Sequence, residues 1–261
     1  MSDPELGWVA ITGSSAGIGE AAAKYLAGRG YGVILASEQA EELRRVEAEI
    51  TEEGGAAEVV DLDLLNEEDV SSFFERVAER VGTCQVLVNN AGIAGPTARI
   101  EDIDDEAWHN CVNICLSSQF YCIKAALPYL RGSKNASIVN LSSAAGKFGF
   151  PLRSPYAAAK WGVVGLTKTL SIELGQDNIR VNAILPGLVD GDRIRRVIEA
   201  KSQQRGLSFA DVEAEALSFS SIKDYVSPQH LADQILLLAS TRGRMISGQA
   251  LSIDGDTKML M

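Results

Sequence analysis

The stretch that decides the fold is Thr12-Gly13-Ser14-Ser15-Ala16-Gly17-Ile18-Gly19, which continues a short apolar run at 8–12. The apolar run predicts a buried strand, and residues 17–28 predict a helix. Gly13, Gly17 and Gly19 keep side chains out of the sharp turn between them, so the backbone can closely approach a bound group. The first amides of the helix, at the positive end of its dipole, suit a phosphate there.

Short apolar runs and longer amphipathic runs alternate along the rest of the chain. Further strands are expected at 32–36, 57–60, 86–89, 137–141, 179–184 and 251–253, and helices at 39–53, 67–81, 104–130 and 155–174. The short connections predict an α/β fold, a doubly wound, Rossmann-type parallel sheet of about seven strands with helices on both faces. In this setting three glycines indicate a dinucleotide site, and the alternative is a glycine-rich turn without a ligand.

No linker rich in proline or serine divides the chain, so we expect residues 1–261 to form one domain. The polar stretch at 187–227 interrupts the alternation and follows a predicted strand. Because such sheets bind ligands beyond the carboxyl ends of their strands, we interpret this stretch as an insertion that covers the substrate.

The chain is acidic, with a net charge of −11 and a pI of about 4.8. Such a surface repels phosphate backbones and anionic lipid, which argues against nucleic-acid and membrane partners. The four cysteines form no CxxC pair and there are two histidines, so we expect buried thiols and no metal site. The sequence has neither a signal-peptide pattern nor an apolar run of membrane-spanning length, so the expected location is the cytoplasm.

The turn after the second predicted strand favours one nicotinamide cofactor over the other. It contains Ser37 and Glu38 but no arginine or lysine, and Ala16 is also uncharged. A 2′-phosphate would be repelled by Glu38, whereas a ribose 2′-hydroxyl can donate to it. We therefore expect NAD, with NADP the weaker candidate. Asp63 is placed to accept from the adenine amino group; alternatively, Glu38 is an ordinary exposed charge and Asp63 only flanks a helix.

Tyr156 and Lys160 are four residues apart in a predicted helix and therefore share a face. Tyrosine is a weak base at neutral pH because its pKa is about 10, but a nearby cation favours the phenolate. Tyr156 can then take a proton from an alcohol or return one to a carbonyl. The pair predicts an oxidoreductase that moves a hydride between a nicotinamide and a small molecule.

Several further motifs occur together: NNAG at 89–92, Asn113, IVNLSS at 138–143, YAAAK at 156–160 and Pro186-Gly187. With TGSSAGIG at 12–19, in this order and spacing, the chain resembles the short-chain dehydrogenase/reductase family over nearly its whole length. The resemblance implies an NAD(P)-dependent alcohol dehydrogenase or carbonyl reductase. Its substrate would be a secondary alcohol, a ketone or an aldehyde.

The resemblance implies a catalytic set of Ser143, Tyr156 and Lys160, supported by Asn113. Ser142 competes with Ser143, and the family's usual interval of thirteen residues before the tyrosine selects Ser143, whose hydroxyl would hold the substrate oxygen. Lys160 would also bind the nicotinamide ribose, and the backbone carbonyl of Asn113 would hold a water beside it. Without the resemblance, Asn113 is only a polar residue in an apolar helix. The expected cofactor contacts are Gly13, Ser15, Ala16, Gly17, Ile18, Gly19, Ser37, Glu38, Asp63, Leu64, Asn90, Ala91, Gly92, Tyr156, Lys160, Pro186, Gly187 and Val189.

The chain departs from the family pattern after Pro186-Gly187. Many members have a threonine there that contacts the carboxamide or a phosphate, whereas this chain continues Leu188-Val189-Asp190-Gly191. The departure puts that contact in doubt and leaves the backbone of Val189 as the expected replacement.

The expected substrate contacts are Ser143, Tyr156, Phe148, Phe150, Arg153 and Leu188. The phenylalanines favour an apolar ring or chain in the substrate, and an arginine is suited to grip a carboxylate or sulfonate. Whether Arg153 does so stays open. Arg193, Arg195 and Arg196 are expected on an exposed helix of the insertion.

The resemblance also implies a homotetramer, assembled through the helix at 104–130 and the catalytic helix. Two alternative functions are a non-catalytic dinucleotide sensor or scaffold, and a lyase or isomerase that uses the same tyrosine. A sensor has no need of the whole Ser143, Tyr156 and Lys160 set. A lyase would cause no net change in nicotinamide absorbance during turnover.

Overall fold

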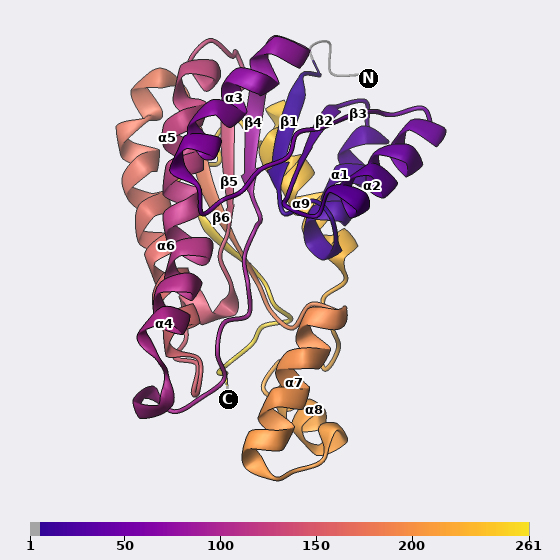
Figure 1. The fold of residues 1–261 in the computed structure, drawn as a ribbon. Coiled ribbons are helices and arrows are strands. Elements are labelled where there is room, and N and C mark those ends of the chain that lie inside the picture. The colour runs from indigo at the N-terminus through magenta and orange to yellow at the C-terminus, as the bar shows by residue number, and fades with distance from the viewer. Residues whose placement is uncertain (1–5, 261) are drawn as a thin grey trace.

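The computed structural model describes residues 6–260, and within them seven strands form one parallel sheet in the order β3-β2-β1-β4-β5-β6-β7 (Figure 1). The predicted doubly wound, Rossmann-type fold is therefore confirmed. The strands are β1 (Trp8–Thr12), β2 (Gly32–Ala36), β3 (Ala56–Val59), β4 (Cys84–Asn89), β5 (Ser137–Leu141), β6 (Arg180–Pro186) and β7 (Ala250–Ile253). The helices are α1 (Gly17–Ala27), α2 (Ala40–Glu52), α3 (Glu67–Val81), α4 (Asp105–Val112), α5 (Ser118–Leu130), α6 (Ser154–Glu173), α7 (Asp192–Arg205), α8 (Phe209–Ser218) and α9 (Pro228–Ala239).

The strand order reverses between β1 and β4. The chain builds outward from β1 to β2 and β3, then returns to place β4 on the other side of β1. Because the strands are parallel, their carboxyl ends share one edge, and the loops after β1 and β4 diverge at this reversal. Such a crevice is where open α/β sheets bind their ligands.

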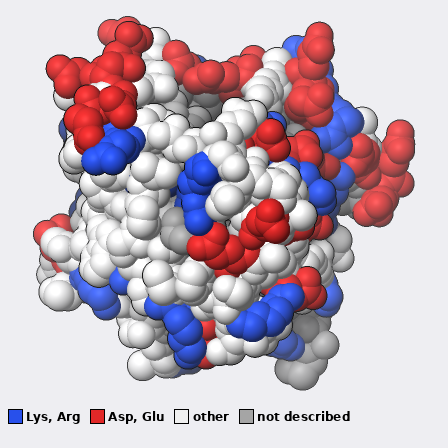
Figure 2. All heavy atoms as spheres, turned by 90° about the horizontal axis from the view of Figure 1, so that it is seen from below, with Lys and Arg blue, Asp and Glu red and all other residues white. Residues whose placement is uncertain are grey.

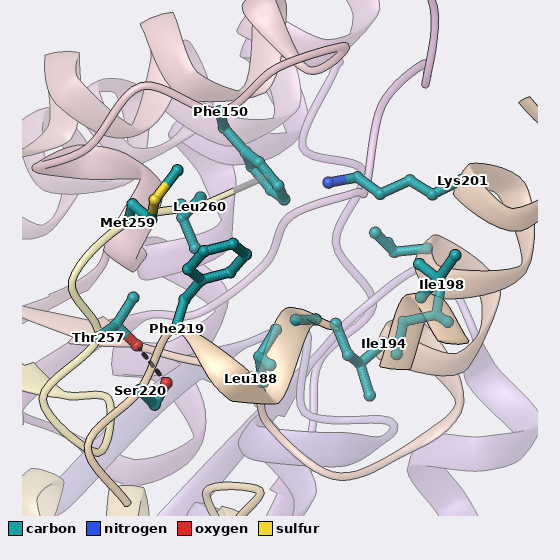
Figure 3. A pocket seen from close by; sticks show the side chains of 13 residues that line it. Phe150, Leu188, Ile194, Ile198, Lys201, Phe219, Ser220, Thr257, Met259 and Leu260 are labelled. Atoms are coloured by element: carbon teal, nitrogen blue, oxygen red, sulfur yellow. Dashed lines mark hydrogen bonds between the residues drawn. The ribbon is translucent and has the colours of Figure 1, made fainter. Parts of the chain in front are cut away.

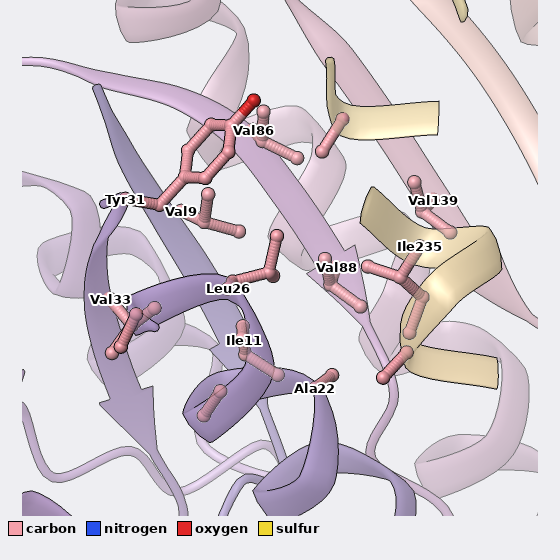
Figure 4. Close-up of a cluster of buried hydrophobic side chains, with 14 of the residues drawn as sticks. Val9, Ile11, Ala22, Leu26, Tyr31, Val33, Val86, Val88, Val139 and Ile235 are labelled. Atoms are coloured by element: carbon pink, nitrogen blue, oxygen red, sulfur yellow. The ribbon is translucent and has the colours of Figure 1, made fainter. Parts of the chain in front are cut away.

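Both faces of the sheet are covered, which explains why its central strands read as nearly continuous apolar runs. Val9 and Ile11 of β1 join one buried cluster with side chains of α1, α2 and α9 (Figure 4). Ala10, which points the other way, joins a second cluster with side chains of α3, α5 and α6. The alternation along β1 thus anchors two helical layers around one sheet.

The expected elements differ from the observed ones at their ends, and α9 (Pro228–Ala239) was not expected at all. β4 begins at Cys84 because its pairing with β1 continues past an irregularity between Trp8 and Val9. β6 extends to Pro186, which pairs with Ile253. The helix expected over 104–130 is α4 and α5 joined by a π-helical turn, Asn113–Ser117.

The stretch expected as an insertion contains α7 and α8, which lie beyond the carboxyl edge of the sheet (Figure 1). Arg193, Arg195 and Arg196 are exposed on α7, as expected. Among the described residues no helix has the length and apolarity needed to cross a bilayer.

Candidate active site

The glycine turn between β1 and α1 is shaped for a phosphate. Gly13 has a φ of +65°, and its amide donates to the carbonyl of Ala36 on β2 at 2.7 Å. A Cβ on Gly19 would lie 2.3 Å from the carbonyl oxygen of Gly13, so only glycine lets helix and turn approach this closely. A Cβ on Gly17 would meet no protein atom within 4 Å. The space before the first amides of α1 is therefore open, and these residues fit a dinucleotide phosphate.

Asn90 fastens this turn to the end of β4. Its side-chain amide donates to the carbonyls of Thr12 and Gly13, at 3.0 and 2.9 Å. The Thr12 hydroxyl in turn accepts from the amides of Asn90 and Ala91, both at 3.1 Å. Gly92 follows, and a Cβ on it would lie 3.7 Å from Nζ of Lys160. The NNAG motif thus connects the phosphate turn to the candidate catalytic lysine.

Two carboxylates meet where the adenosine half of a dinucleotide would lie. Burial and the charge of Asp63 raise the pKa of Glu38 above its usual value. Both side chains are exposed at the carboxyl ends of β2 and β3. Asp63 also accepts from the amide of Leu65 at 2.8 Å, so it closes its own turn. The region is locally negative, which disfavours a third anionic group.

The sequence reasoning missed Arg45, which reaches this region from α2. Its guanidinium donates to the carbonyl of Ser15 at 3.3 Å and pairs with Glu20, Glu42 and Glu49. Those three glutamates surround its charge. No sequence signal places a residue of the second helix against the first turn, because the contact depends on how α1 and α2 pack.

The two serines after β5 have different surroundings. The hydroxyl of Ser142 is buried and donates to the carbonyl of Lys160 at 2.7 Å, so it ties β5 to α6. Ser143 is partly exposed, and its hydroxyl accepts from the amide of Ala145 at 3.1 Å. Ser143 therefore keeps its own proton available for another acceptor, whereas Ser142 has used its proton within the chain.

Tyr156 and Lys160 lie one turn apart at the start of α6. Nζ of Lys160 is 5.7 Å from the centre of the Tyr156 ring and donates to the carbonyl of Leu141, at the end of β5, at 2.7 Å. Lys160 is only 3% exposed. A buried ammonium held by one carbonyl has two further protons to donate. Helix α6 thus places the Lys160 ammonium beside the Tyr156 phenol. The residue whose carbonyl holds this ammonium, Leu141, comes two residues before Ser143 in the chain.

Asn113 opens the π-helical turn between α4 and α5. Its carbonyl accepts from the amide of Ser118, five residues on, and its exposed side chain accepts from the Ser117 hydroxyl at 3.3 Å. The side chain is therefore not aimed at Lys160. If Asn113 contributes to the site, it does so through its backbone carbonyl, which is the group that the family resemblance implies.

The segment after β6 is held by backbone pairing. Gly187 packs so closely against Asp254 that a Cβ on it would lie 2.7 Å from that residue's Cα. Val226 donates to the carbonyl of Leu188 and accepts from the amide of Asp190. These bonds flank Val189 and leave its own amide and carbonyl outside the pair.

A cavity lies between this segment, α7, α8 and the residues after β7 (Figure 3). Phe150 and Leu188, two of the expected substrate contacts, line it, as do Lys201 and Phe219, which the sequence reasoning missed. The other expected substrate contacts, Ser143, Phe148, Arg153 and Tyr156, do not line it. The carbonyl of Phe148 accepts from the Trp161 indole at 3.4 Å. Figure 2 views the molecule from the side on which α7 and α8 lie: acidic side chains gather at the upper margins and again near the centre, and basic ones are scattered among uncharged areas.

Arg153 lies directly before α6 and is buried beside Tyr156. Its guanidinium is 5.0 Å from the centre of the Tyr156 ring and 5.1 Å from that of Phe150, and it donates to the carbonyl of Ala94. Leu152 immediately before it has a φ of +64°, which is uncommon for a residue with a side chain. The backbone is thus bent where it delivers this arginine.

No group of three or more His, Cys, Asp or Glu side chains within residues 6–260 could hold a metal ion. The four cysteines are buried free thiols, as expected.

The fold and this site define a dinucleotide-binding protein with a tyrosine–lysine pair beside the binding crevice. A sequence model of the short chain dehydrogenase family matches residues 7–202, and the chain belongs to this family. D-beta-hydroxybutyrate dehydrogenase of Rhizobium meliloti is 33% identical over 94% of this chain and 96% of its own. Trans-4-hydroxycyclohexanecarboxylate dehydrogenase of Sinomonas cyclohexanicum is 36% identical over 94% of this chain and 90% of its own.

Solved structures agree with this assignment. NAD+-bound xylitol dehydrogenase has a TM-score of 0.93 and 26% identity, covering 97% of this chain and 99% of that one. Actinorhodin polyketide ketoreductase with NADPH has a TM-score of 0.91 and 31% identity, covering 98% of both chains. The chain is therefore an oxidoreductase of a family that binds nicotinamide cofactors, and these two neighbours hold different ones.

Proposed function

We propose that the protein is an alcohol dehydrogenase or carbonyl reductase that prefers NAD and uses Tyr156 as its general acid and base. The observation that carries this proposal is the buried ammonium of Lys160, 5.7 Å from the Tyr156 ring and next to Gly92. The names of the two relatives above denote hydroxy acids, which supports a hydroxy or keto substrate.

In the direction of oxidation, the substrate alcohol loses a proton to Tyr156 and a hydride from its carbon, and becomes a carbonyl compound. The nicotinamide, when bound, is the hydride acceptor, or the donor in reverse. Ser143 holds the substrate oxygen with its free proton. The positive charge of Lys160 stabilises the negative charge that develops on the Tyr156 oxygen. In reduction each of these steps runs backward.

The preference for NAD rests on the pair Glu38 and Asp63. A 2′-phosphate would add about two negative charges beside two carboxylates, and the nearby cation, Arg45, is already engaged by three glutamates. A free 2′-hydroxyl can instead donate to a carboxylate oxygen of Glu38. Glycine-turn residues Gly13 to Gly19 and the backbone of Val189 complete the proposed cofactor contacts.

A panel of alcohols and carbonyl compounds with NAD(H) and NADP(H), followed at the absorbance of the reduced nicotinamide, tests the reaction. We expect Tyr156→Phe to lower kcat by about 100- to 10,000-fold, the usual contribution of a positioned acid or base. Tyr129→Phe, the same change on α5 where Tyr129 stacks on Phe74, is the matched control and should leave turnover intact. Turnover that survives Tyr156→Phe would reject the mechanism.

We also propose a homotetramer. Three large apolar side chains on α5 and α6 are exposed to solvent: Phe120 by 46%, Trp161 by 51% and Ile172 by 82%. Contact with another subunit would bury this apolar surface. Sedimentation equilibrium at micromolar concentration should give four times the chain mass. A monomer under these conditions would contradict the proposal.

A further inference from the structure

Besides Lys160, two further cations are buried close to the aromatic ring of Phe150. Arg153 is 2% exposed and Lys201 is 4% exposed. Within residues 6–260 neither makes an ion pair. Buried charges in folded proteins are ordinarily paired, because removing an isolated ion from water is costly. The charge of Glu215 reaches Lys201, but this carboxylate pairs with Arg205 at 2.9 Å, so among the described residues neither buried cation has an acid of its own.

The guanidinium of Arg153 has donors to spare. One Nη donates to the carbonyl of Ala94, but Nε is buried and has no hydrogen-bond partner. Its remaining contacts are with the faces of the Tyr156 and Phe150 rings. The bond to Ala94 uses one Nη and does not explain why Nε is buried without a partner. A planar anion could accept from Nε together with Nη2 on the same edge of the guanidinium, since Nη2 carries a second proton besides the one that it donates to Ala94.

Lys201 approaches from the opposite element, α7. Among the described residues that line the cavity, Lys201 is the one with a charged side chain. Its ammonium points at Phe150, with Nζ 4.1 Å from the ring centre (Figure 3). Burial, and next the charge of Arg153, lower the pKa of Lys201 to about 7. The rest of the wall is apolar apart from Ser220 and Thr257, whose hydroxyls bond each other at 3.0 Å.

Arg153 Cζ and Lys201 Nζ lie 5.1 and 4.1 Å from the centre of the same ring, Phe150, and the charge of Arg153 contributes to the lowered pKa of Lys201, so the two cations share one region. Arg153 also faces the ring of Tyr156, so this region lies within a small molecule's length of the proton-transfer group. An anion placed there would neutralise the two charges, while an apolar body would fit against Phe150, Leu188 and Phe219.

We propose that the substrate is a hydroxy or keto carboxylic acid whose carboxylate is held by Arg153 and Lys201 while its hydroxyl or carbonyl group lies at Tyr156. This inference rests on the proposed function and adds the substrate class to it. A carboxylate matches the planar donors of a guanidinium, and its single charge suits a pocket that is otherwise apolar.

The test compares hydroxy acids with their primary amides, which keep the shape and lose the charge. A panel of linear, cyclic and aromatic hydroxy acids, each beside its amide, is assayed with NAD+. In every pair that turns over, the acid should have the higher kcat/KM, by about tenfold or more. Amides that react as well as their acids would overturn the inference while leaving the proposed function intact. If no alcohol or carbonyl compound of any kind reacts, the proposed function fails instead.

Variants locate the effect. Lys201→Met and Arg153→Met should each lower the ratio of kcat/KM for an acid to that for its amide by about tenfold or more, so the preference collapses. Arg196→Met, which removes an exposed charge from the same helix α7, is the matched control and should leave the preference intact. If Arg153→Met does not fold, Arg153→Lys keeps the charge without the fork and should lose part of the preference. An acid-to-amide ratio unchanged in Lys201→Met and Arg153→Lys would reject the assignment.

Discussion

The cofactor side and the substrate side of the candidate site are built in opposite ways. On the cofactor side, glycines bring backbone against backbone, and Asn90, Thr12 and Ser14 bond within the chain. On the substrate side, Arg153 and Lys201 are buried without an acid. The cofactor side thus has its polar groups bonded within the chain and depends on close packing. On the substrate side the two buried charges lower the stability of the fold, and a bound anion would offset this loss. Substitutions should therefore affect the two sides differently.

The largest effect is expected from one methyl group on the cofactor side. In Gly19→Ala the new Cβ would lie 2.3 Å from the Gly13 carbonyl oxygen and 2.5 Å from the Asn90 amide, so the turn must shift. We expect a loss of about 1–3 kcal/mol of stability, typical of overpacking, and NAD binding weakened beyond detection in a calorimetric titration. Gly175→Ala in the turn after α6, where a Cβ meets nothing within 4 Å, is the control and should stabilise slightly. Native stability and binding in Gly19→Ala would show that the turn has room.

A smaller effect is expected at the adenosine end of the cofactor side. Glu38→Arg replaces a repelling carboxylate beside Asp63 with a cation that can bond a 2′-phosphate. The ratio of kcat/KM for NADP to that for NAD should rise by about 10- to 100-fold, the worth of a charge-assisted hydrogen bond. Glu52→Arg makes the same charge change at the far end of α2 and should leave the ratio alone. An unchanged ratio in Glu38→Arg would remove the basis for the NAD preference.

The smallest effect, and the one of opposite sign, is expected on the substrate side. Folding disfavours the cationic form of Lys201, whose pKa falls to about 7, with Arg153 and Arg205 adding repulsion and Glu215 only partly offsetting it. Below pH 7 the lysine is charged in both states and the full cost applies; the cost shrinks as pH rises toward the unfolded pKa of about 10.4. Lys201→Met should therefore raise Tm, by a few degrees at pH 6 and less at pH 9.

Thermal unfolding of the full chain at the two pH values measures this difference. Arg196→Met again serves as the control, because its exposed charge costs nothing to fold. A Tm that falls in Lys201→Met at pH 6 would mean that the ammonium stabilises the fold, and the contrast between the two sides would be lost.

The sequence was most informative where the structure depends on a local pattern of neighbouring residues. The strand–helix alternation located every strand, and the three glycines located the sharp turn between β1 and α1, because both depend on local patterns. The cofactor contacts of that turn stay a prediction. The Ser143, Tyr156 and Lys160 set was drawn from motif spacing, and its catalytic role stays a prediction. The serine choice gains a physical reason from the structure, since Ser142 spends its proton on the Lys160 carbonyl.

The sequence was least informative where distant elements meet. Lys201 lies in a polar helix and looks like a solvated charge until α7 packs against Phe150. Arg45 likewise shows no sign of its contact with Ser15. Hydrophobic periodicity marks which face of a helix is buried, but it does not reveal which side chain of another element that face will contact.

The π-helical turn at Asn113–Ser117 has a consequence for the catalytic helix's neighbours. Each residue of an α-helix advances the rotation by about 100°, and a π turn contains one residue more than the regular repeat requires. α4 packs against α6, while α5 packs against α3 and β4. The turn therefore sets the rotation of α5, which packs on the sheet, relative to α4, which packs on the helix that carries Tyr156 and Lys160. Deleting one residue there would restore a regular helix, yet it would turn Cys122, Ile123 and Leu130 away from the core that they fill.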